Sequence, residues 1–185
     1  MKIKINSLIY ISSSSIYYKK KSVIGSVKLK CEKYIIKNKN LFSNYQIWRP
    51  FNLIDKKYTN TDHFHNYLFK QMFLKKKKSS IFFGNASDMR GYSDVNHFVQ
   101  VMYKYSKVNN SFVKDYGNKN LIKISEIVNL FNIDYKKING KNFKASFRSN
   151  LINISKVKPK KNSIFYNKKS ISLFKKYLKN SINEN

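Results

Sequence analysis

Lysines interleaved with aromatic residues are the side chains of this sequence whose types and spacing could carry chemistry. The stretch "KKINGK", residues 136–141, places three lysines around an Asn-Gly pair that is typical of a tight hairpin turn. Lysine ammoniums neutralise phosphates, and tyrosine and phenylalanine rings can stack on unpaired bases. The pattern therefore predicts contact with a nucleic-acid backbone, and RNA is favoured because long acid-free arms suit a densely folded RNA.

The expected RNA contacts are basic residues of the middle and the last third of the chain. Arg90 is one of only three arginines, and its fork of donors suits a bidentate bond to a phosphate or a carboxylate. Two interpretations of the four-lysine run at 75–78 stay open: it caps a helix end, or it contacts phosphate. The full set is Lys75, Lys76, Lys77, Lys78, Arg90, Lys136, Lys137, Lys141, Lys144, Arg148, Lys158, Lys160 and Lys161.

The distribution of charge supports this interpretation better than the total does. Lys plus Arg number 38 against 9 Asp plus Glu, a net charge of +29. An A/T-rich genome explains why lysine replaces arginine, but not why residues 1–31 hold seven lysines and no acid. Residues 135–183 also lack acids, whereas 88–134 are nearly balanced. These segments predict a globular middle flanked by ends that bind a polyanion.

Other kinds of chemistry lack the residues they need. One cysteine excludes an internal disulfide, and three histidines without a matching acid cluster make a metal site unexpected. The glycine spacing fits neither common phosphate-cradling loop, and the sequence has no nucleophile motif. We therefore expect no enzyme activity, no cofactor, no metal and no small-molecule substrate. We also expect no transmembrane segment, because no apolar run reaches about 18 residues.

Periodicity predicts an α+β fold, with a small helical core, then a short antiparallel β-hairpin region, and basic extensions at both ends. Helical spacing appears at 61–74, at 94–106 behind Ser93, at 124–131 behind Ser125, and from Ser170 onward. Trp48 is interpreted as an anchor to the core rather than a base-stacking residue. Strand patterns occupy the following segments: 142–148, 152–154 and 163–166, with only a weak pattern at 26–30.

The same patterns divide the chain into four regions. Residues 107–120 are expected to be a polar connection between two helices. Residues 1–44 are expected to be weakly structured and ordered only on binding. The expected divisions are a basic extension at 1–44, a mainly helical core at 45–134, a basic β region at 135–167, and a basic helix with its tail at 168–185.

Two short motifs resemble a known RNA-binding family. "INGK", residues 138–141, and "VKPKKNSI", residues 157–164, are similar to the turn and the strand end of small-subunit ribosomal protein four. The composition and layout of the whole chain resemble a mitochondrially encoded ribosomal protein of an A/T-rich, ciliate-like protist. The resemblance implies that Lys137 and Lys141 lie beside ribosomal RNA.

Composition and resemblance together predict a structural constituent of the mitochondrial ribosome, in its small subunit and in the matrix. The expected partners are ribosomal RNA and neighbouring ribosomal proteins. The alternative is a peripheral subunit of an inner-membrane respiratory complex, in which the lysines would face anionic lipid.

Overall fold

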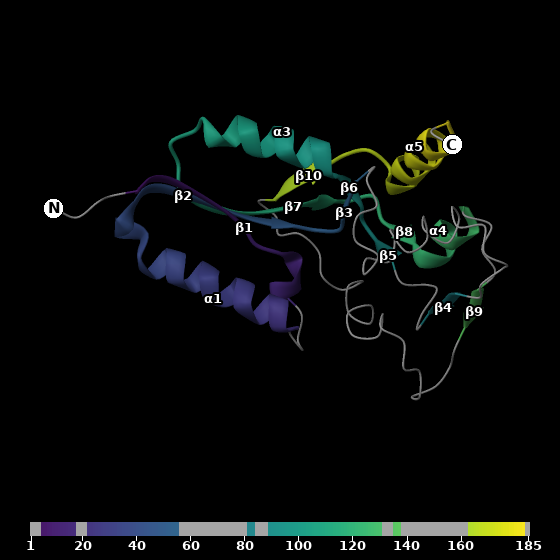
Figure 1. Ribbon diagram of the computed structural model, residues 1–185, viewed down its shortest axis with the longest axis horizontal. Helices are drawn as coiled ribbons and strands as arrows, with labels where there is room; N and C mark the ends of the chain where they lie inside the picture. The colour runs from purple at the N-terminus through teal and green to yellow at the C-terminus, as the bar shows by residue number, and fades with distance from the viewer. Residues whose placement is uncertain are drawn as a thin grey trace.

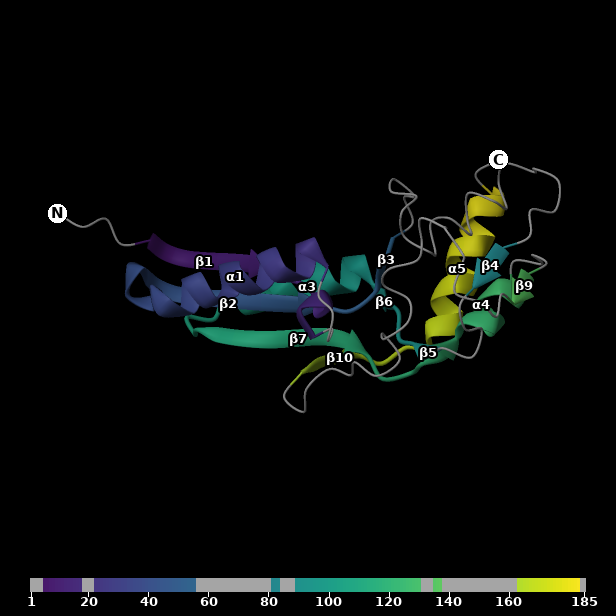
Figure 2. The same ribbon diagram turned by 90° about the horizontal axis from the view of Figure 1, so that it is seen from below.

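A four-stranded parallel sheet organises the part of the chain that the computed structural model describes, residues 5–17, 22–55, 81–83, 89–130, 135–137 and 163–183. The strand order is β1-β2-β7-β10, and each neighbouring pair runs parallel. Helices α1 and α3 lie on opposite faces of this sheet (Figures 1 and 2). The bounds are β1 Ile5–Ile11, β2 Phe42–Pro50, β7 Phe112–Asn118, β10 Ile164–Tyr166, α1 Val23–Lys37 and α3 Val95–Ser106.

The smaller elements gather at the end of the sheet where its strands finish (Figure 1). Three two-stranded sheets form there: β3 with β6, β4 with β9, and β5 with β8, of which only the last is antiparallel. The bounds are β3 Leu53–Ile54, β4 Ile81–Phe83, β5 Met89–Arg90, β6 Ser93–Asp94, β8 Ile122–Lys123, α4 Ile124–Leu130, β9 Tyr135–Lys137 and α5 Ser170–Asn183. There are also two 3-10 turns among the described residues. η1, Ser14–Tyr17, follows β1, and η2, Lys39–Leu41, directly precedes β2.

Helix α1 packs against the turn that follows β1. The Ser22 side chain caps the helix by accepting a hydrogen bond of 3.1 Å from the Gly25 N–H. A Cβ atom at Gly25 would lie 2.8 Å from the Ser15 carbonyl oxygen, so only glycine lets the helix approach η1 this closely.

Helix α3 covers the other face through an aromatic cluster around Trp48. Asp94 caps this helix by accepting from the Asn96 N–H at 2.8 Å. The Trp48 ring is fully buried and lies edge-on to three rings, with centroid distances of 6.0 Å to Phe98, 5.5 Å to Tyr105 and 5.1 Å to Phe112. Such edge-to-face pairs add to the hydrophobic stabilisation of the core.

The main sheet corrects the predicted fold class. The chain is α/β with a parallel sheet, and the expected antiparallel arrangement is wrong for this sheet. The predicted turn at 139–140, the strands at 142–148 and 152–154, and the helix at 61–74 lie outside the described residues.

Segments that the sequence analysis interpreted as weakly structured or polar form part of the main sheet and of a helix that covers it. The described parts of 1–44 include β1 and α1, and the weak strand pattern at 26–30 is helical. Residues 112–118, expected to be a connection, form strand β7 in the middle of the sheet. Asp115 of β7 is 3% exposed, and its burial depends on partners distant in sequence.

Several expectations are confirmed. Trp48 is a core residue, β10 lies within the predicted strand 163–166, and α5 begins at Ser170 with Phe174 and Tyr177 buried. The helix at 94–106 is present, although Asp94 rather than Ser93 caps it. Ser125 lies inside α4 rather than before it. Within the described ranges, none of the helices is long and apolar enough to span a bilayer.

Candidate functional site

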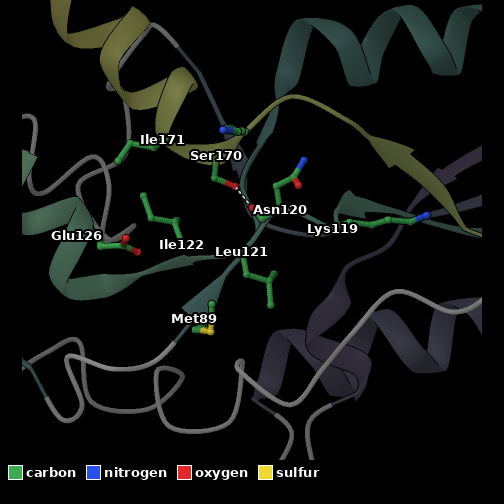
Figure 3. A pocket seen from close by; sticks show the side chains of 9 residues that line it. Met89, Lys119, Asn120, Leu121, Ile122, Glu126, Ser170 and Ile171 are labelled. Atoms are coloured by element: carbon green, nitrogen blue, oxygen red, sulfur yellow. Dashed lines mark hydrogen bonds between the residues drawn. The ribbon is translucent and has the colours of Figure 1, made fainter.

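The carboxyl ends of the parallel strands define the edge where a ligand site is expected. In open α/β sheets, ligands bind in the crevice outside these ends, because the loops there converge above the sheet. Strand β7 ends at Asn118, and the chain continues through Lys119 and Asn120 into β8. The start of α5 lies beside this loop (Figure 3).

A cavity of about 490 Å³ opens at this place. It is bounded by the loop after β7, the first turn of α5, and residues of β5, β8 and α4 (Figure 3). Its volume falls within the usual range of small-molecule pockets. The lining residues are Met89, Lys119, Asn120, Leu121, Ile122, Glu126, Lys169, Ser170 and Ile171.

Two polar side chains hold the loop after β7 against the start of α5. The Ser170 hydroxyl donates to the Asn120 carbonyl at 2.6 Å and accepts from the Tyr92 N–H at 3.0 Å. The Asn118 amide donates to the Tyr92 carbonyl at 2.6 Å and to the Lys168 carbonyl at 2.8 Å. Both side chains are buried, at 2% and 3% exposure, so they fix the cavity wall.

Two lysines and the start of a helix border the cavity. Lys119 and Lys169 are both exposed, and the Lys119 Nζ atom lies 4.2 Å from the centre of the Phe165 ring. The first turn of the 14-residue helix α5 adds the positive end of its dipole. Glu126 is the one carboxylate of the lining, and its Oε2 atom already accepts from the Lys123 N–H at 2.8 Å. This arrangement favours a phosphorylated ligand.

Apolar residues form the remainder of the lining. Met89, Leu121 and Ile171 line the cavity, with Met89 and Leu121 exposed at 38% and 37%. Exposed apolar side chains in a concave site favour the flat faces of a base or a sugar ring. The cavity therefore suits a small molecule with an anionic end and a ring.

Arg90 is the described side chain among the predicted RNA contacts, and it lies in β5 next to the cavity residue Met89. It is 5% exposed, so it does not lie on an open surface. Burial raises the pKa of the Tyr92 hydroxyl, and the nearby Arg90 guanidinium opposes this rise. Arg90 is thus a buried residue beside the cavity residue Met89, and its predicted contact with RNA stays a prediction.

The side chains of the other predicted RNA contacts are not described, so the structure does not show whether they lie close together. Only the backbone of Lys136 and Lys137 is described, and it forms β9 beside β4. The remaining predicted contacts lie outside the described residues: Lys75, Lys76, Lys77, Lys78, Lys141, Lys144, Arg148, Lys158, Lys160 and Lys161.

The sequence analysis missed the lysines of the cavity. Lys119 and Lys169 each stand beside a structural boundary, the end of a strand and the start of a helix. Ser170 was recognised as a helix start, but the pairing of that start with the end of β7 depends on a parallel contact between β7 and β10. The available signal was the polar stretch "GNKN", residues 117–120.

A second cluster of polar side chains lies under α1, and its members form hydrogen bonds with one another. The Arg49 guanidinium bonds Glu32 through Nε at 3.0 Å, and its NH1 donates to the Tyr17 hydroxyl at 2.6 Å. Tyr17 in turn donates to Asp115 at 2.7 Å, and Ser12 donates to Glu32. Ser12, Glu32 and Asp115 of this network are buried and Arg49 and Tyr17 are half-buried, and their mutual bonds hold the turn after β1 in place.

Lys28 places a further ammonium near the end of β1. Its Nζ donates to the Ile11 carbonyl at 2.7 Å and lies 5.0 Å from the centre of the Tyr10 ring. Burial, followed by contact with Cys31, raises the pKa of the Tyr10 hydroxyl. A protonated tyrosine and a lysine therefore stand together beside the carboxyl end of this strand.

Comparison with solved structures finds the same fold in sugar-nucleotide enzymes. MoeE5 in complex with UDP-glucose and NAD matches with a TM-score of 0.60 and 16% identity, over 71% of this chain and 52% of that chain. UDP-glucuronic acid 4-epimerase from Bacillus cereus in complex with NAD matches with a TM-score of 0.58 and 24% identity, over 71% and 50%. dTDP-glucose 4,6-dehydratase from Bacillus anthracis in complex with NAD matches with a TM-score of 0.59 and 16% identity, over 73% and 50%.

The matched region spans about half the length of these three structures. No protein family and no curated protein sequence matches the chain. At these identities the likeness establishes the fold, which is the α/β fold of NAD-dependent sugar-nucleotide epimerases and dehydratases.

This fold overturns the functional prediction from composition. The resemblance to small-subunit ribosomal protein four is wrong, because the parallel sheet matches sugar-nucleotide enzymes instead. The expectations of ribosomal RNA as partner, of no small-molecule substrate and of no enzyme activity are contradicted by the same comparison. The alternative of a respiratory-complex subunit gains no better support, and the mitochondrial location stays a prediction.

The glycines of this chain do not fit the pyrophosphate of a dinucleotide. A cradle for that group needs glycines spaced G-x-G-x-x-G between a strand and a helix, and the five glycines here have no such spacing. A Cβ atom at Gly25 would meet the Ser15 carbonyl oxygen at 2.8 Å, and one at Gly91 would meet the Asn118 carbonyl oxygen at 2.3 Å. Backbone therefore fills the space that each of these glycines leaves.

Proposed function

We propose that this chain binds a sugar nucleotide and takes part in its enzymatic conversion, as a component of an NAD-dependent epimerase or dehydratase. The observation that carries the proposal is the cavity at the carboxyl edge of the sheet, which is lined by Lys119, Lys169 and the start of α5. The fold supports it, because the three matched structures hold NAD, and MoeE5 also holds UDP-glucose.

The chain's own residues would bind and orient the substrate. The diphosphate would lie against the first turn of α5, within reach of the two lysine ammoniums. The apolar lining would pack on the ring, and the Ser170 and Asn118 bonds would keep the site in shape before binding. The net charge of +29 would raise the local concentration of anionic ligands. NAD would supply hydride transfer when bound, although the glycines of this chain do not have the spacing of a pyrophosphate cradle.

Titration of the purified protein with UDP-glucose by calorimetry tests the proposal. The Lys169→Met and Lys119→Met variants should each weaken binding about tenfold, which corresponds to about 1.4 kcal/mol. Lys104→Met is the matched control, because Lys104 is an exposed lysine in the last turn of α3 and does not line the cavity. The control should bind UDP-glucose like the unmodified protein at 0.15 M salt.

Equal loss of affinity in all three variants would contradict the proposal, because it would show a general charge effect. Binding of inorganic pyrophosphate as tight as that of UDP-glucose would contradict it too, since the apolar lining would then contribute nothing.

A further inference from the structure

Within the part of the chain that the structure describes, strand β1 pairs with another strand on one side only. It is the edge strand of the main sheet, seven residues long, and among the described residues only β2 pairs with it (Figure 2). Parallel sheets are normally buried on both faces, and an open edge of this length is a template for another strand. On the side of β1 away from β2, no described strand pairs with its N–H and C=O groups, although Lys28 Nζ donates to the Ile11 carbonyl at 2.7 Å. This edge therefore offers a site for strand addition.

The register of the sheet shows which side chains of β1 lie on the α3 face. Ile11 pairs with Trp48, and Ile9 pairs with Gln46 on the same face. Trp48 packs under α3, so Ile9 and Ile11 lie on that face as well. They remain 41% and 44% exposed, because α3 does not extend over β1.

Helix α3 turns an exposed apolar flank toward the same edge. His97 packs against Tyr116 and Tyr166, at centroid distances of 6.0 Å and 5.1 Å, on the side of β7 and β10. Val99 and Tyr103 lie on the opposite flank of the helix and are 52% and 64% exposed. We call the four residues Ile9, Ile11, Val99 and Tyr103 the β1 shelf.

Charge and length indicate what covers the β1 shelf. Two copies of a chain with a net charge of +29 repel each other, so an acidic partner is favoured over a second copy. The matched structures contain about as many residues again as the part that this chain covers. Their NAD requires a pyrophosphate loop that the described glycines do not form.

We propose that the β1 shelf docks an acidic α/β module that adds a parallel strand to β1 and carries the glycine-rich dinucleotide loop. Main-chain hydrogen bonds along β1 give the affinity, and Ile9, Ile11, Val99 and Tyr103 pack under a helix of the module. The nature of the module rests on the function proposed above. The contact itself can be tested without any ligand, so failure of one proposal is distinguishable from failure of the other.

Photo-crosslinking from β1 tests the contact directly. The chain is expressed in its native source with the photoreactive residue p-benzoylphenylalanine in place of Ile9, irradiated, and its crosslinked peptides are identified by mass spectrometry. The matched control carries the same residue in place of Phe165, in the opposite edge strand β10. We expect an adduct at position 9, absent at position 165, whose peptides come from an acidic segment outside residues 1–185 with a strand, a G-x-G-x-x-G turn and a helix.

Three results would overturn the proposal. An adduct to residues 1–185 would show that another copy or another segment of this chain covers the shelf. An adduct to a polypeptide without the glycine-rich pattern would show a different partner. Equal yields at positions 9 and 165 would show that β1 has no specific contact.

Substitution of apolar residues of the β1 shelf by lysine tests the same contact independently of crosslinking. Ile9→Lys combined with Ile11→Lys should reduce recovery of the partner at least tenfold in a pull-down of the natively expressed chain. Val23→Lys, at an 81% exposed position of α1 on the other face, should leave recovery unchanged. Unchanged thermal unfolding of both variants excludes misfolding as the cause, and equal recovery from both would contradict the proposal.

Discussion

The two faces of the main sheet are built from opposite chemistry, although both start from the same strand. On β2, Trp48 points to the α3 face and the next residue, Arg49, points to the α1 face. The α3 face is an aromatic cluster around Trp48, with the Lys114 ammonium against its outer rings, 4.9 Å from the Tyr105 centroid and 5.3 Å from that of Phe112. The α1 face is a hydrogen-bonded network of Arg49, Glu32, Asp115 and Tyr17.

The difference teaches how each face tolerates change. An apolar cluster loses stability in proportion to the contacts removed, because neighbouring rings collapse only partly into the space. A buried charge network fails differently, since removal of one partner leaves another charge without compensation. Substitutions that remove a charge, and changes of pH, should therefore lower stability most on the α1 face. Substitutions that reduce side-chain volume should lower it most on the α3 face.

Truncation of Trp48 should have the largest effect. Trp48→Ala leaves a large cavity at the centre of the aromatic cluster and should lower the free energy of unfolding by about 4 kcal/mol. Urea denaturation followed by circular dichroism measures it. Tyr103→Ala, on the exposed side of α3, should stay within about 0.5 kcal/mol. A similar loss in both variants would contradict the assignment of Trp48 as the centre of the α3 face.

Neutralisation of Glu32 should cause the second-largest loss of stability. Glu32 is 1% exposed and bonds both Arg49 and Ser12, so Glu32→Gln should cost about 3 kcal/mol of unfolding free energy. The same measurement at high salt should give the same loss, because a buried pair is screened little. Glu126→Gln, at an exposed carboxylate, is the control and should cost less than about 0.5 kcal/mol. If the loss of unfolding free energy in Glu32→Gln disappeared at high salt, this would show that water screens the network.

The smallest effect concerns pH. Burial, and then the hydrogen bond to Asp115, raises the pKa of the Tyr17 hydroxyl above its ordinary value of 10.0. The protonated hydroxyl therefore stabilises the fold below pH 10, and this contribution is lost as the pH rises above it. Tyr17→Phe should be less stable than the unmodified protein at pH 8 by about 1 kcal/mol, and the gap should narrow by about 1 kcal/mol at pH 11.

The exposed Tyr34 provides the control for that measurement. Tyr34→Phe should change the free energy of unfolding by less than about 0.5 kcal/mol at pH 8, since Tyr34 is 63% exposed. A gap for Tyr17→Phe that stays constant with pH would mean that the network does not hold the proton.

Local patterns predicted the helices of the described chain better than the strands. Val95–Ser106 and Ser170–Asn183 show apolar residues at helical spacing, a signal contained in a few consecutive turns. Strand β7 was missed because its "FVKDYGN" pattern contains Lys114 and Asp115. The charge of Asp115 is acceptable in a buried strand only because Arg49 and Tyr17 approach it.

The candidate site was beyond local patterns for a related reason. Lys119 and Lys169 are fifty residues apart, and only the parallel pairing of β7 with β10 brings their loops to one edge. The prediction of RNA binding came from the high proportion of lysine. Lysine content alone does not distinguish a surface that binds a polyanion from a pocket that binds one small anion.

The sequence by itself determined the positive charge, the absence of a glycine-rich dinucleotide loop, and the amphipathic helices, because these depend on residue identity and on neighbours within a few turns. The tertiary structure decided the parallel sheet, the partners of its buried charges, and the sheet edge at which the cavity lined by Lys119 and Lys169 forms. Parallel strands pair only after a long crossover, so their register is set by packing across the whole sheet and not by any short segment.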